Sequence, residues 1–461
     1  MLNKIHPIWL LITGILLFRL VSLAFYPLID TTEARYGEIA RIMLETQNWI
    51  TPQFDYNVPF WGKPPLHTWA SAAFGGLLGV SEFSLRLPHL IISLITLFVV
   101  SIFAKRFNIS ASLVVLVLAS TLGFFVASGM IMTDAFLLLG MTMAMIGFAL
   151  AWRDNSNKFA YLGFTGIGIG LLAKGPIILV LIGLAIVPWL LFNYGLVNGV
   201  KALYRKIPLF KGLALTLAIS VPWYLLAESA TPGFLNYFII GEHFLRFVQS
   251  GWEGDLYGTA HSEPRGIIWA YWVIVAFPWS LYFAGLLVMK KYRATLSQHK
   301  FNFYLPSYLI CWLISPMLLF TMSGNILPIY VLPGIPALAL LLGIMLQQVK
   351  FNLVITSLLT PLLMLIFLTI QLPKISNEKS DKTLLSNIVS EFDLYYLHKR
   401  SFSGRFYSAG RAIEINSVEA LNSIHEPYYL VVDRKLLASE EFSEICKKVN
   451  HNKRRVLLLC N

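Results

Sequence analysis

A succession of long apolar runs dominates this 461-residue sequence and limits what it can fold into. A run of about 20 apolar residues can cross the hydrocarbon core of a bilayer as a helix. The candidate runs occupy residues 7–28, 86–104, 111–131, 133–152, 161–174, 175–194, 209–228, 266–288, 303–322, 328–349 and 351–371. With 57% hydrophobic and only 13% charged residues, the composition is that of a polytopic membrane protein. We therefore expect an α-helical membrane protein with about eleven spans.

The charges in the loops predict how these spans are oriented. With the N-terminus in the cytoplasm, one side holds a single acid, Asp154, and many basic residues, whereas the other side is mostly acidic before residue 374. Basic residues concentrate in the cytoplasmic loops of membrane proteins. The basic residues of that side are Lys4, Lys105, Arg106, Arg153, Lys158, Lys201, Arg205, Lys206, Lys211, Lys290, Lys291, Arg293, Lys300 and Lys350. This bias accounts for the net charge of +12, so no nucleic-acid partner is expected.

The last 88 residues, 374–461, have the composition of a soluble domain. Apolar runs at Tyr428–Val432 and Val456–Leu459 predict strands, and helical patterning occurs near 380–399 and 437–449. We expect a small extracytoplasmic α/β domain after a transmembrane domain of residues 1–373, whose outer loops are 30–69 and 229–265. The three cysteines, Cys311, Cys446 and Cys460, match no metal-binding spacing and allow at most one disulfide.

The outer loop 30–69 is unusually long for a loop between spans, and three of its first six residues are charged. Asp30, Glu33 and Arg35 could together supply a proton acceptor, ligands for a divalent cation and a phosphate contact. In the simpler alternative Asp30 only caps the following helix and Glu33 completes a capping box. The charges that follow at helical spacing, Glu38, Arg41 and Glu45, are interpreted as an ion-pair ladder.

Two lysines on the outer side precede prolines, at Lys63-Pro64 and Lys174-Gly175-Pro176. A lysine just before a helix N-terminus faces the positive end of the helix dipole, which favours an anion at that place. Two such lysines could hold one phosphate, although a lysine in the lipid headgroup layer is the simpler interpretation of either one alone.

Three more polar residues of the outer side are candidates. Asp134 lies at the start of an apolar run, where a carboxylate is costly and more often functional, with helix capping as the alternative. Arg246 follows His243 by about one helical turn, so both would share a face, and Arg246 could bind phosphate. His243 with its neighbouring carboxylates is a weak metal signal.

Seven motifs occur in order along residues 8–345. They are Asp-x-x-Glu-x-Arg-Tyr-x-Glu-Ile-Ala-Arg (30–41), Gly-Lys-Pro-Pro (62–65), Thr-Asp (133–134), Lys-Gly-Pro (174–176), Glu-His-x-x-Arg-Phe (242–247), Phe-Pro-Trp (277–279) and Tyr-x-Leu-Pro (330–333). The set resembles the aminoarabinose (lipid A) transferase and protein O-mannosyltransferase group of bacterial C-type integral-membrane glycosyltransferases.

This resemblance implies a fold, an activity and roles for several residues. Members of the group transfer a sugar, with inversion, from a polyprenyl-phosphate donor to a lipid or protein acceptor on the periplasmic side of the inner membrane. Asp30 matches the catalytic aspartate of the first loop, Lys63 and Arg35 match contacts to the donor phosphate, and His243 falls where some members have a metal ligand. A divalent metal cation is thus an optional cofactor.

The sequence departs from the group at two positions. Gly62 replaces the acidic residue that precedes the first-loop lysine in aminoarabinose transferases, and Asn325 replaces a lysine found in many relatives. The first change removes a metal ligand and the second a cationic contact.

From the residues and the resemblance together we expect a polyprenyl-phosphate-sugar-dependent glycosyltransferase. Asp30, Glu33 and Asp134 are the catalytic candidates. Lys63, Lys174, Arg35 and Arg246 are the candidates for binding the donor phosphate. The alternatives are a transporter or flippase of a lipid-linked sugar, and a ligase that takes a glycan from a lipid diphosphate. The clustering of polar residues at one membrane face, and not near the midplane, speaks against a transporter.

Overall fold

The computed structural model describes residues 7–249, 251–258, 261–291, 294, 296, 303–346, 353–389, 391–424, 426–437 and 446–460. The chain divides into two compact units. Unit 1 consists of Met1–Val21, Pro59–His67 and Arg86–Leu363, and unit 2 of Ser22–Val58, Thr68–Leu85 and Met364–Asn461.

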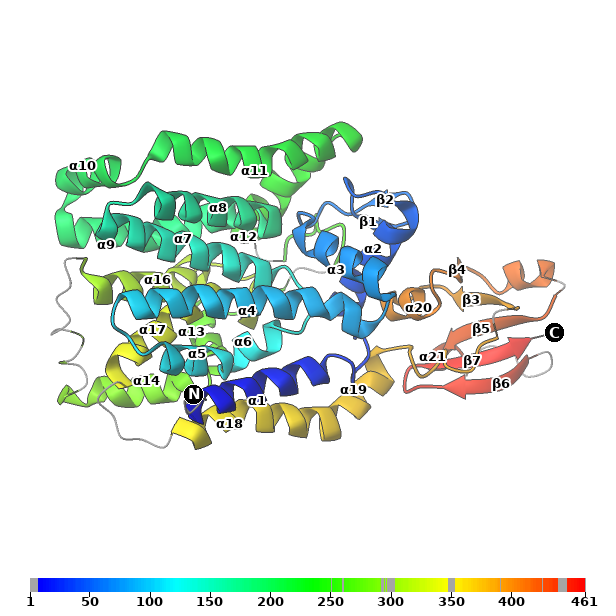
Figure 1. The fold of residues 1–461 in the computed structure, drawn as a ribbon. Helices are drawn as coiled ribbons and strands as arrows, with labels where there is room; N and C mark the ends of the chain where they lie inside the picture. Colours follow the sequence, from blue (N-terminus) through cyan, green and yellow to red (C-terminus); the bar gives the residue numbers. More distant parts are fainter. Residues whose placement is uncertain are drawn as a thin grey trace. The chain divides into compact units, whose positions relative to one another are not determined.

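Unit 1 is helical. Its helices, some of which extend a few residues beyond the unit, are α1 Pro7–Ser22, α4 Glu82–Arg106, α5 Ala111–Ala119, α6 Leu122–Ala127, α7 Asp134–Asp154, α8 Asn157–Lys174, α9 Ile177–Tyr194, α10 Leu196–Lys206, α11 Leu209–Ala230, the π-helix η1 Asn236–Leu245, α12 Arg246–Val248, α13 Ile268–Val275, α14 Trp279–Val288, α16 Leu305–Phe320, the 3-10 helix η2 Pro328–Gly334, α17 Ile335–Leu346 and α18 Leu353–Ile366 (Figure 1).

Several of these helices are suited to crossing a membrane. Among the described residues, six helical segments are long and apolar enough: Glu82–Arg106, Asp134–Asp154, Ile177–Tyr194, Leu209–Ala230, Pro328–Leu346 and Leu353–Lys379. The pair α13 and α14 would add a seventh if it is one span bent by 103°. Shorter apolar helices are α1 and α16. Each apolar run of the sequence contains helix, whereas the number of eleven spans stays a prediction.

The run at residues 111–131, expected as one span, consists of two short helices, α5 and α6. The break falls at Ser120 and Thr121, whose hydroxyls donate to the carbonyl oxygens of Leu116 and Val117 one turn back. Such hydroxyl bonds compete with the helical backbone pattern. The amide of Leu122 donates instead to the carbonyl oxygen of Phe277, at 2.8 Å. This contact joins the break to the bend between α13 and α14.

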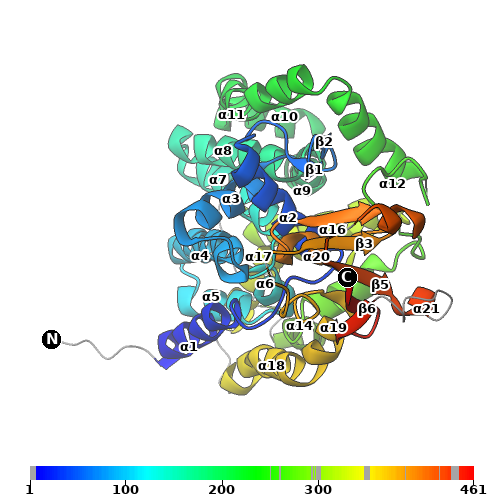
Figure 2. The ribbon, with the colours of Figure 1, turned by 90° about the vertical axis from the view of Figure 1, so that its right-hand side faces the viewer.

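Helix α7 is the centre of unit 1, since its apolar window is entirely buried. Figure 2 shows α11, α8 and α7 side by side. Glycines allow α7 and α8 to touch through their backbones: a Cβ on Gly140 would lie 2.7 Å from the carbonyl oxygen of Gly166, and one on Gly147 would lie 2.5 Å from the amide of Gly163. Small residues permit this close approach between membrane helices.

Unit 2 combines helices with two sheets. Its helices are α2 Thr32–Thr46, α3 Leu66–Leu78, the π-helix η3 Phe367–Gln371, α19 Leu372–Lys379, α20 Phe402–Tyr407, the 3-10 helix η4 Glu419–Ser423 and α21 Arg434–Leu437. A small hairpin pairs β1 Gln53–Asp55 with β2 Val58–Pro59. The larger sheet consists of β3 Asp393–Leu397, β4 Ala412–Ile415, β5 Tyr428–Asp433, β6 Cys446–His451 and β7 Arg455–Cys460.

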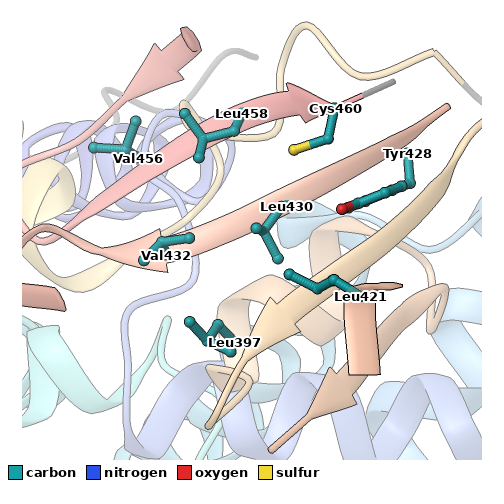
Figure 3. Packing of buried hydrophobic residues seen from close by; sticks show 8 residues of the cluster. All are labelled: Leu397, Leu421, Tyr428, Leu430, Val432, Val456, Leu458 and Cys460. Atoms are coloured by element: carbon teal, nitrogen blue, oxygen red, sulfur yellow. The ribbon is translucent and has the colours of Figure 1, made fainter. Parts of the chain in front are cut away.

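The larger sheet has the strand order β4-β3-β5-β7-β6. Strand β3 runs parallel to β4 and β5, and β7 runs antiparallel to β5 and β6. A disulfide links Cys446 of β6 to Cys460 of β7. Both faces are covered. Figure 3 shows the face on which Leu397, Leu430 and Leu458 pack with Leu421 of η4. On the opposite face, Tyr396 and Val431 pack in a second cluster, against which Tyr407 of α20 also packs.

The predicted strands at 428–432 and 456–459 are confirmed as β5 and β7. The predicted helical character near 380–399 is wrong for residues 393–397, which form β3 between β4 and β5 with side chains buried on both faces. Burial on both faces removes the alternation that usually reveals a strand. Residues 446–449, expected as part of a helix, lie in β6, and residues 438–445 lie outside the described part of the chain. The boundary at residue 373 stays a prediction.

Candidate active site

In unit 1, one buried carboxylate holds two of the predicted phosphate-binding cations. Glu242 lies in the π-helix η1, and its side chain is 4% exposed. Its oxygens accept from Lys63 at 3.0 Å and from Arg246 at 2.9 Å. Arg246 also lies 3.3 Å from Asp255. These two cations hold the pKa of Glu242 below its usual value against the effect of burial, so the group is a carboxylate.

Aromatic residues fix the loop that carries Lys63. The hydroxyl of Tyr257 accepts from the amide of Trp61 at 3.0 Å and donates to the carbonyl oxygen of Pro59 at 2.9 Å. The indole of Trp61 donates to Thr231 at 3.1 Å. A Cβ on Gly62 would lie 2.9 Å from the ring of Phe60, so the acidic residue that relatives carry there would not fit without moving this ring.

Lys174 forms a second buried ion pair in unit 1. Its ammonium lies 2.7 Å from Asp134 at the start of α7, and both side chains are nearly inaccessible. The ammonium also lies 4.3 Å from the centre of the Tyr330 ring, a cation–π geometry. Thr133, not Asp134, is the N-cap residue of α7, so the pairing with Lys174 accounts for the buried carboxylate better than capping does.

His243 connects the two ion pairs. One ring nitrogen lies 2.7 Å from the carbonyl oxygen of Phe238 and the other 3.1 Å from that of Lys174. The turn after Lys174 requires Gly175, which has φ +85° and whose Cβ would lie 2.6 Å from Phe238 and 2.9 Å from His243. Burial lowers the pKa of His243, which favours the neutral imidazole. Lys63 and Arg246 therefore meet at Glu242, and the adjacent His243 contacts the backbone of Lys174, whose ammonium is held by Asp134.

These contacts bear on the predicted metal site. Both ring nitrogens of His243 lie close to backbone carbonyl oxygens, which leave no room for a cation at either nitrogen. The described residues contain no group of three His, Cys, Asp or Glu side chains that could hold a metal ion. In this conformation the residues do not fit the metal site that the resemblance implies, at His243 or at Asp30.

Asp30 belongs to unit 2 and does not cap helix α2. The N-cap residue is Thr31, without a side-chain cap bond. The carboxylate of Asp30 accepts instead from the amide of Ser403 at 2.9 Å and from its hydroxyl at 2.7 Å. Burial raises the pKa of Asp30 to about 6, although both bonds from Ser403 act to lower it. A carboxylate with this pKa is a better proton acceptor at neutral pH than an ordinary aspartate.

The other charged residues of α2 are also partly buried. Glu33, in the first turn, is 3% exposed, and the Arg35 guanidinium lies 5.2 Å from the centre of the Tyr36 ring. Arg41 donates to Glu38 at 2.8 Å and to Glu45 at 2.5 Å, which confirms the ion-pair ladder. The ladder is less solvated than a surface ladder, since Glu38 is almost fully buried.

The predicted site residues thus fall into two groups. Unit 1 contains Lys63, Asp134, Lys174, His243 and Arg246, and unit 2 contains Asp30, Glu33 and Arg35. Sequence reasoning missed the roles of Glu242, Asp255, Tyr330 and Ser403. Glu242 offered a signal, since it lies four residues before Arg246 at ion-pair spacing. Ser403 offered none, because its partner is more than 370 residues away.

Known proteins resemble this chain in sequence and in fold. The profile of the dolichyl-phosphate-mannose-protein mannosyltransferase family matches residues 19–238. The undecaprenyl phosphate-alpha-4-amino-4-deoxy-L-arabinose arabinosyl transferase of Erwinia tasmaniensis is 29% identical over 339 residues, 71% of this chain and 57% of that protein. The corresponding protein of an Enterobacter species is 27% identical over 342 residues, 72% and 58% of the two chains. The chain spans less than two thirds of the length of these curated relatives.

The fold has a counterpart among solved structures. The crystal structure of ArnT from Cupriavidus metallidurans bound to undecaprenyl phosphate superposes with a TM-score of 0.77. The match covers 99% of this chain and 98% of that one at 18% identity. The apo form of the same protein gives a TM-score of 0.78.

Together, the motifs, the family profile and the fold place the chain among the relatives of the C-type integral-membrane glycosyltransferases. Its fold is similar to that of ArnT from Cupriavidus metallidurans. The resemblance inferred from the seven motifs is confirmed. The predicted fold class is confirmed with it: a helical multi-pass membrane protein with a C-terminal α/β domain.

Proposed function

We propose that this chain is a glycosyltransferase that moves a sugar from an undecaprenyl-phosphate carrier to a lipid acceptor of the lipid A type. The names of its relatives support this donor and suggest 4-amino-4-deoxy-L-arabinose as the sugar. The reaction would take place on the outer side of the bacterial inner membrane.

One observation carries the proposal. Two cations that the sequence singled out for a phosphate, Lys63 and Arg246, meet at Glu242, and the backbone carbonyl of the third, Lys174, contacts the adjacent His243, although the three come from separate segments of unit 1. Buried carboxylates hold all three in place: Glu242, Asp134 and Asp255. Cations fixed in advance need little rearrangement to stabilise a developing charge.

The donor phosphate is the leaving group of the proposed reaction. An acceptor oxygen attacks the anomeric carbon, the bond from this carbon to the phosphate oxygen breaks, and undecaprenyl phosphate leaves with additional negative charge. Lys63 uses two of its three hydrogens, on Gly62 and Glu242, which leaves one ammonium hydrogen available for a phosphate oxygen. Arg246 likewise has five N–H donors, more than its two carboxylate partners require.

Asp30 is the proposed acceptor of the proton that the attacking group loses. Its raised pKa suits this role, since a base is most effective with a pKa near the working pH. Glu33 and Asp134 are less suited: Glu33 is buried in α2, and Asp134 is engaged by Lys174. Arg35 remains a candidate contact for the donor phosphate by resemblance only.

The proposed orientation places the C-terminal domain outside the cytoplasm, in the periplasm, with the N-terminus in the cytoplasm. The distribution of basic residues supports it. The disulfide between Cys446 and Cys460 also supports it, because disulfides persist in oxidising compartments.

The proposal can be tested by mass spectrometry of bacterial cells with and without this chain. Lipid A, other glycolipids and secreted proteins would be compared. We expect lipid A to carry an additional aminopentose only when the chain is present. A sugar found on secreted proteins would mean that the acceptor is a protein and not a lipid. Transfer of a whole glycan would indicate a ligase. If no fraction differed between the two kinds of cells, the transferase assignment would be contradicted.

A further inference from the structure

Unit 2 contains a pocket of about 520 Å³, and Asp30 is the only one of its lining residues that the proposed reaction uses. Its walls are the ends of β3 and β5, the segment from His398 to Phe402, helix α21 and the turn before β7, with Asp30 and Thr31. Ligand pockets typically have volumes of about 300–1,000 Å³. The pocket is therefore large enough for a small headgroup.

The topology of the sheet makes this a favoured place for a ligand. Strand β3 lies between β4 and β5 and is parallel to both, so the chain leaves β3 toward one side and later returns to the other. The connections pack on opposite faces, since Tyr407 of α20 and Leu421 of η4 belong to different core clusters. In open parallel sheets, ligands bind outside the carboxyl ends of the strands at this switch point. Leu397 and Asp433, which end β3 and β5, both line the pocket.

The charges of the pocket select the class of ligand. Six basic side chains line it, and only two acids do. The basic residues are His398, Lys399, Arg400, Lys435, Arg454 and Arg455, and the acids are Asp30 and Asp433.

Two of the basic residues are already paired: Arg400 lies 2.7 Å from Asp55, and Arg455 lies 2.6 Å from Asp381. Lys399, Lys435 and Arg454 have no ion-pair partner within 4.0 Å among the residues that the structure describes. These three side chains are exposed. The paired arginines are held in place, while the three unpaired cations can take up a new anion.

We propose that this pocket binds the phosphorylated headgroup of a sugar. Lysine and arginine are the usual partners of phosphate, and several of them around one pocket favour a group with more than one negative charge. The half-buried ring of Phe402 supplies flat apolar surface for the sugar. The inference rests on the geometry of the C-terminal sheet and shares only Asp30 with the proposed reaction.

The test is a binding measurement on the full-length protein in phosphatidylcholine nanodiscs. Glucosamine 1-phosphate is the probe, inorganic phosphate tests the anion alone, and glucosamine tests the sugar alone. We expect saturable calorimetric binding of glucosamine 1-phosphate, weaker binding of phosphate and none of glucosamine. Lys399→Ala/Arg454→Ala should weaken binding about tenfold or more.

Two controls make the result specific. Lys447→Ala/Lys448→Ala removes two exposed lysines of β6, outside the pocket, and should change the affinity less than about twofold. Asp30→Asn removes an opposing negative charge and should tighten binding. Thermal unfolding would verify that each variant is folded. No saturable binding to the wild type below about 10 mM, or an equal loss of affinity in the pocket variant and in the β6 control, would overturn the proposal.

The source of the phosphate is a separate outcome of the same experiment. Lipid A added to the nanodiscs should compete with glucosamine 1-phosphate if the natural ligand is a lipid headgroup. Phosphatidylglycerol at the same surface charge should not compete. Binding of the soluble probe without competition by lipid A would assign the pocket to a free sugar phosphate, and equal competition by both lipids would show a general charge effect and contradict the proposal.

Discussion

The ammonium of Lys63 lies 3.0 Å from a carboxylate oxygen of Glu242, which also accepts from Arg246. One almost fully buried carboxylate therefore fixes Lys63, which lies 179 residues earlier in the chain, and Arg246, which lies four residues later. Taking a charge out of water is costly unless it is paired, so each of the three side chains depends on the others. The arrangement explains why a membrane protein keeps a glutamate at this buried position.

The first prediction concerns Glu242 and stability. Glu242→Gln should lower the free energy of unfolding at pH 7 by about 3 kcal/mol, because Lys63 and Arg246 lose their shared partner. The pKa of Glu242 is lower in the folded protein than its ordinary value of 4.5 in the unfolded chain. The ionised Glu242 therefore stabilises the fold above pH 4.5, and this stabilisation is lost as the pH falls through the folded pKa. The unfolding temperatures of the wild type and of Glu242→Gln should therefore become similar at acidic pH.

Glu45→Gln is the matched control. Glu45 also pairs with an arginine, but its side chain is 53% exposed. Surface pairs contribute about 0–1 kcal/mol, so this variant should unfold almost as the wild type does at pH 7. A similar loss of unfolding free energy in Glu242→Gln and Glu45→Gln would show that the burial of Glu242 does not strengthen its contribution to stability.

The second prediction concerns the donor. Lys63→Ala should lower kcat/KM for the donor by an amount equivalent to about 1.5–3 kcal/mol, which is the range for a hydrogen bond to a charged group. The loss would be measured as kcat/KM for a polyprenyl-phosphate sugar in reconstituted vesicles. Lys105→Ala, which removes an exposed lysine at the end of α4, serves as the control. Unchanged donor kinetics in Lys63→Ala would remove this residue from the phosphate site.

The third prediction asks whether Lys174 serves only in its ion pair with Asp134 or also contacts the donor. Lys174→Met should destabilise the fold by about 3–5 kcal/mol, because Asp134 would remain buried without its cation. Adding Asp134→Asn should restore most of the stability, since the uncompensated charge is gone. Glycosyl transfer should stay low in the double variant if Lys174 contacts the donor. Full recovery of transfer would mean that the pair is only structural.

The fourth prediction concerns Asp30, whose pKa burial raises from 3.8 to about 6. The folded protein then binds more protons than the unfolded chain between these values, so stability should fall as the pH rises from about 4 to 6. Asp30→Asn should remove this cost and raise the free energy of unfolding at pH 7 by about 1–2 kcal/mol, allowing for partial exposure. Asparagine can keep both contacts with Ser403. A variant less stable than the wild type at every pH would contradict the raised pKa.

The fifth prediction concerns topology. A reporter that is active only in the cytoplasm should remain silent when it is fused after residue 461. The cysteines offer an independent readout, since Cys446 and Cys460 should resist alkylation until a reductant is added. A bright C-terminal reporter would place the soluble domain in the cytoplasm and reverse the assignment of the outer loops.

Much of the fold was predictable from the sequence because its strongest signals are local. Apolar runs locate the helices, and the runs at 428–432 and 456–459 locate two strands of the C-terminal sheet. The break at Ser120 and Thr121 was not predictable, because it depends on a contact with Phe277 far along the chain. Strand β3 was missed because burial on both faces hides the alternation of a strand.

The candidate site was predictable in its residues but not in its pairings. Lys63, Lys174 and Arg246 stood out by charge and position, whereas the carboxylates that hold them required the structure. Asp30 shows the limit most clearly. Its neighbours in the sequence suggested a helix cap, and only the structure reveals Ser403 as its partner. Long-range partners leave no periodic trace in a single sequence.

The central claim is sugar transfer from an undecaprenyl-phosphate carrier, and one measurement tests it most directly. Purified wild-type protein and Asp30→Asn protein, in equal amounts, would be reconstituted with undecaprenyl phosphate-4-amino-4-deoxy-L-arabinose and lipid A. Mass spectrometry would then follow both lipids over time. We predict that the wild type converts lipid A to a product heavier by one aminopentose and releases undecaprenyl phosphate. Asp30→Asn should be slower by at least about 100-fold, as expected when a general base is lost. A wild-type reaction that leaves both lipids unchanged, or an Asp30→Asn protein as fast as the wild type, would contradict the account.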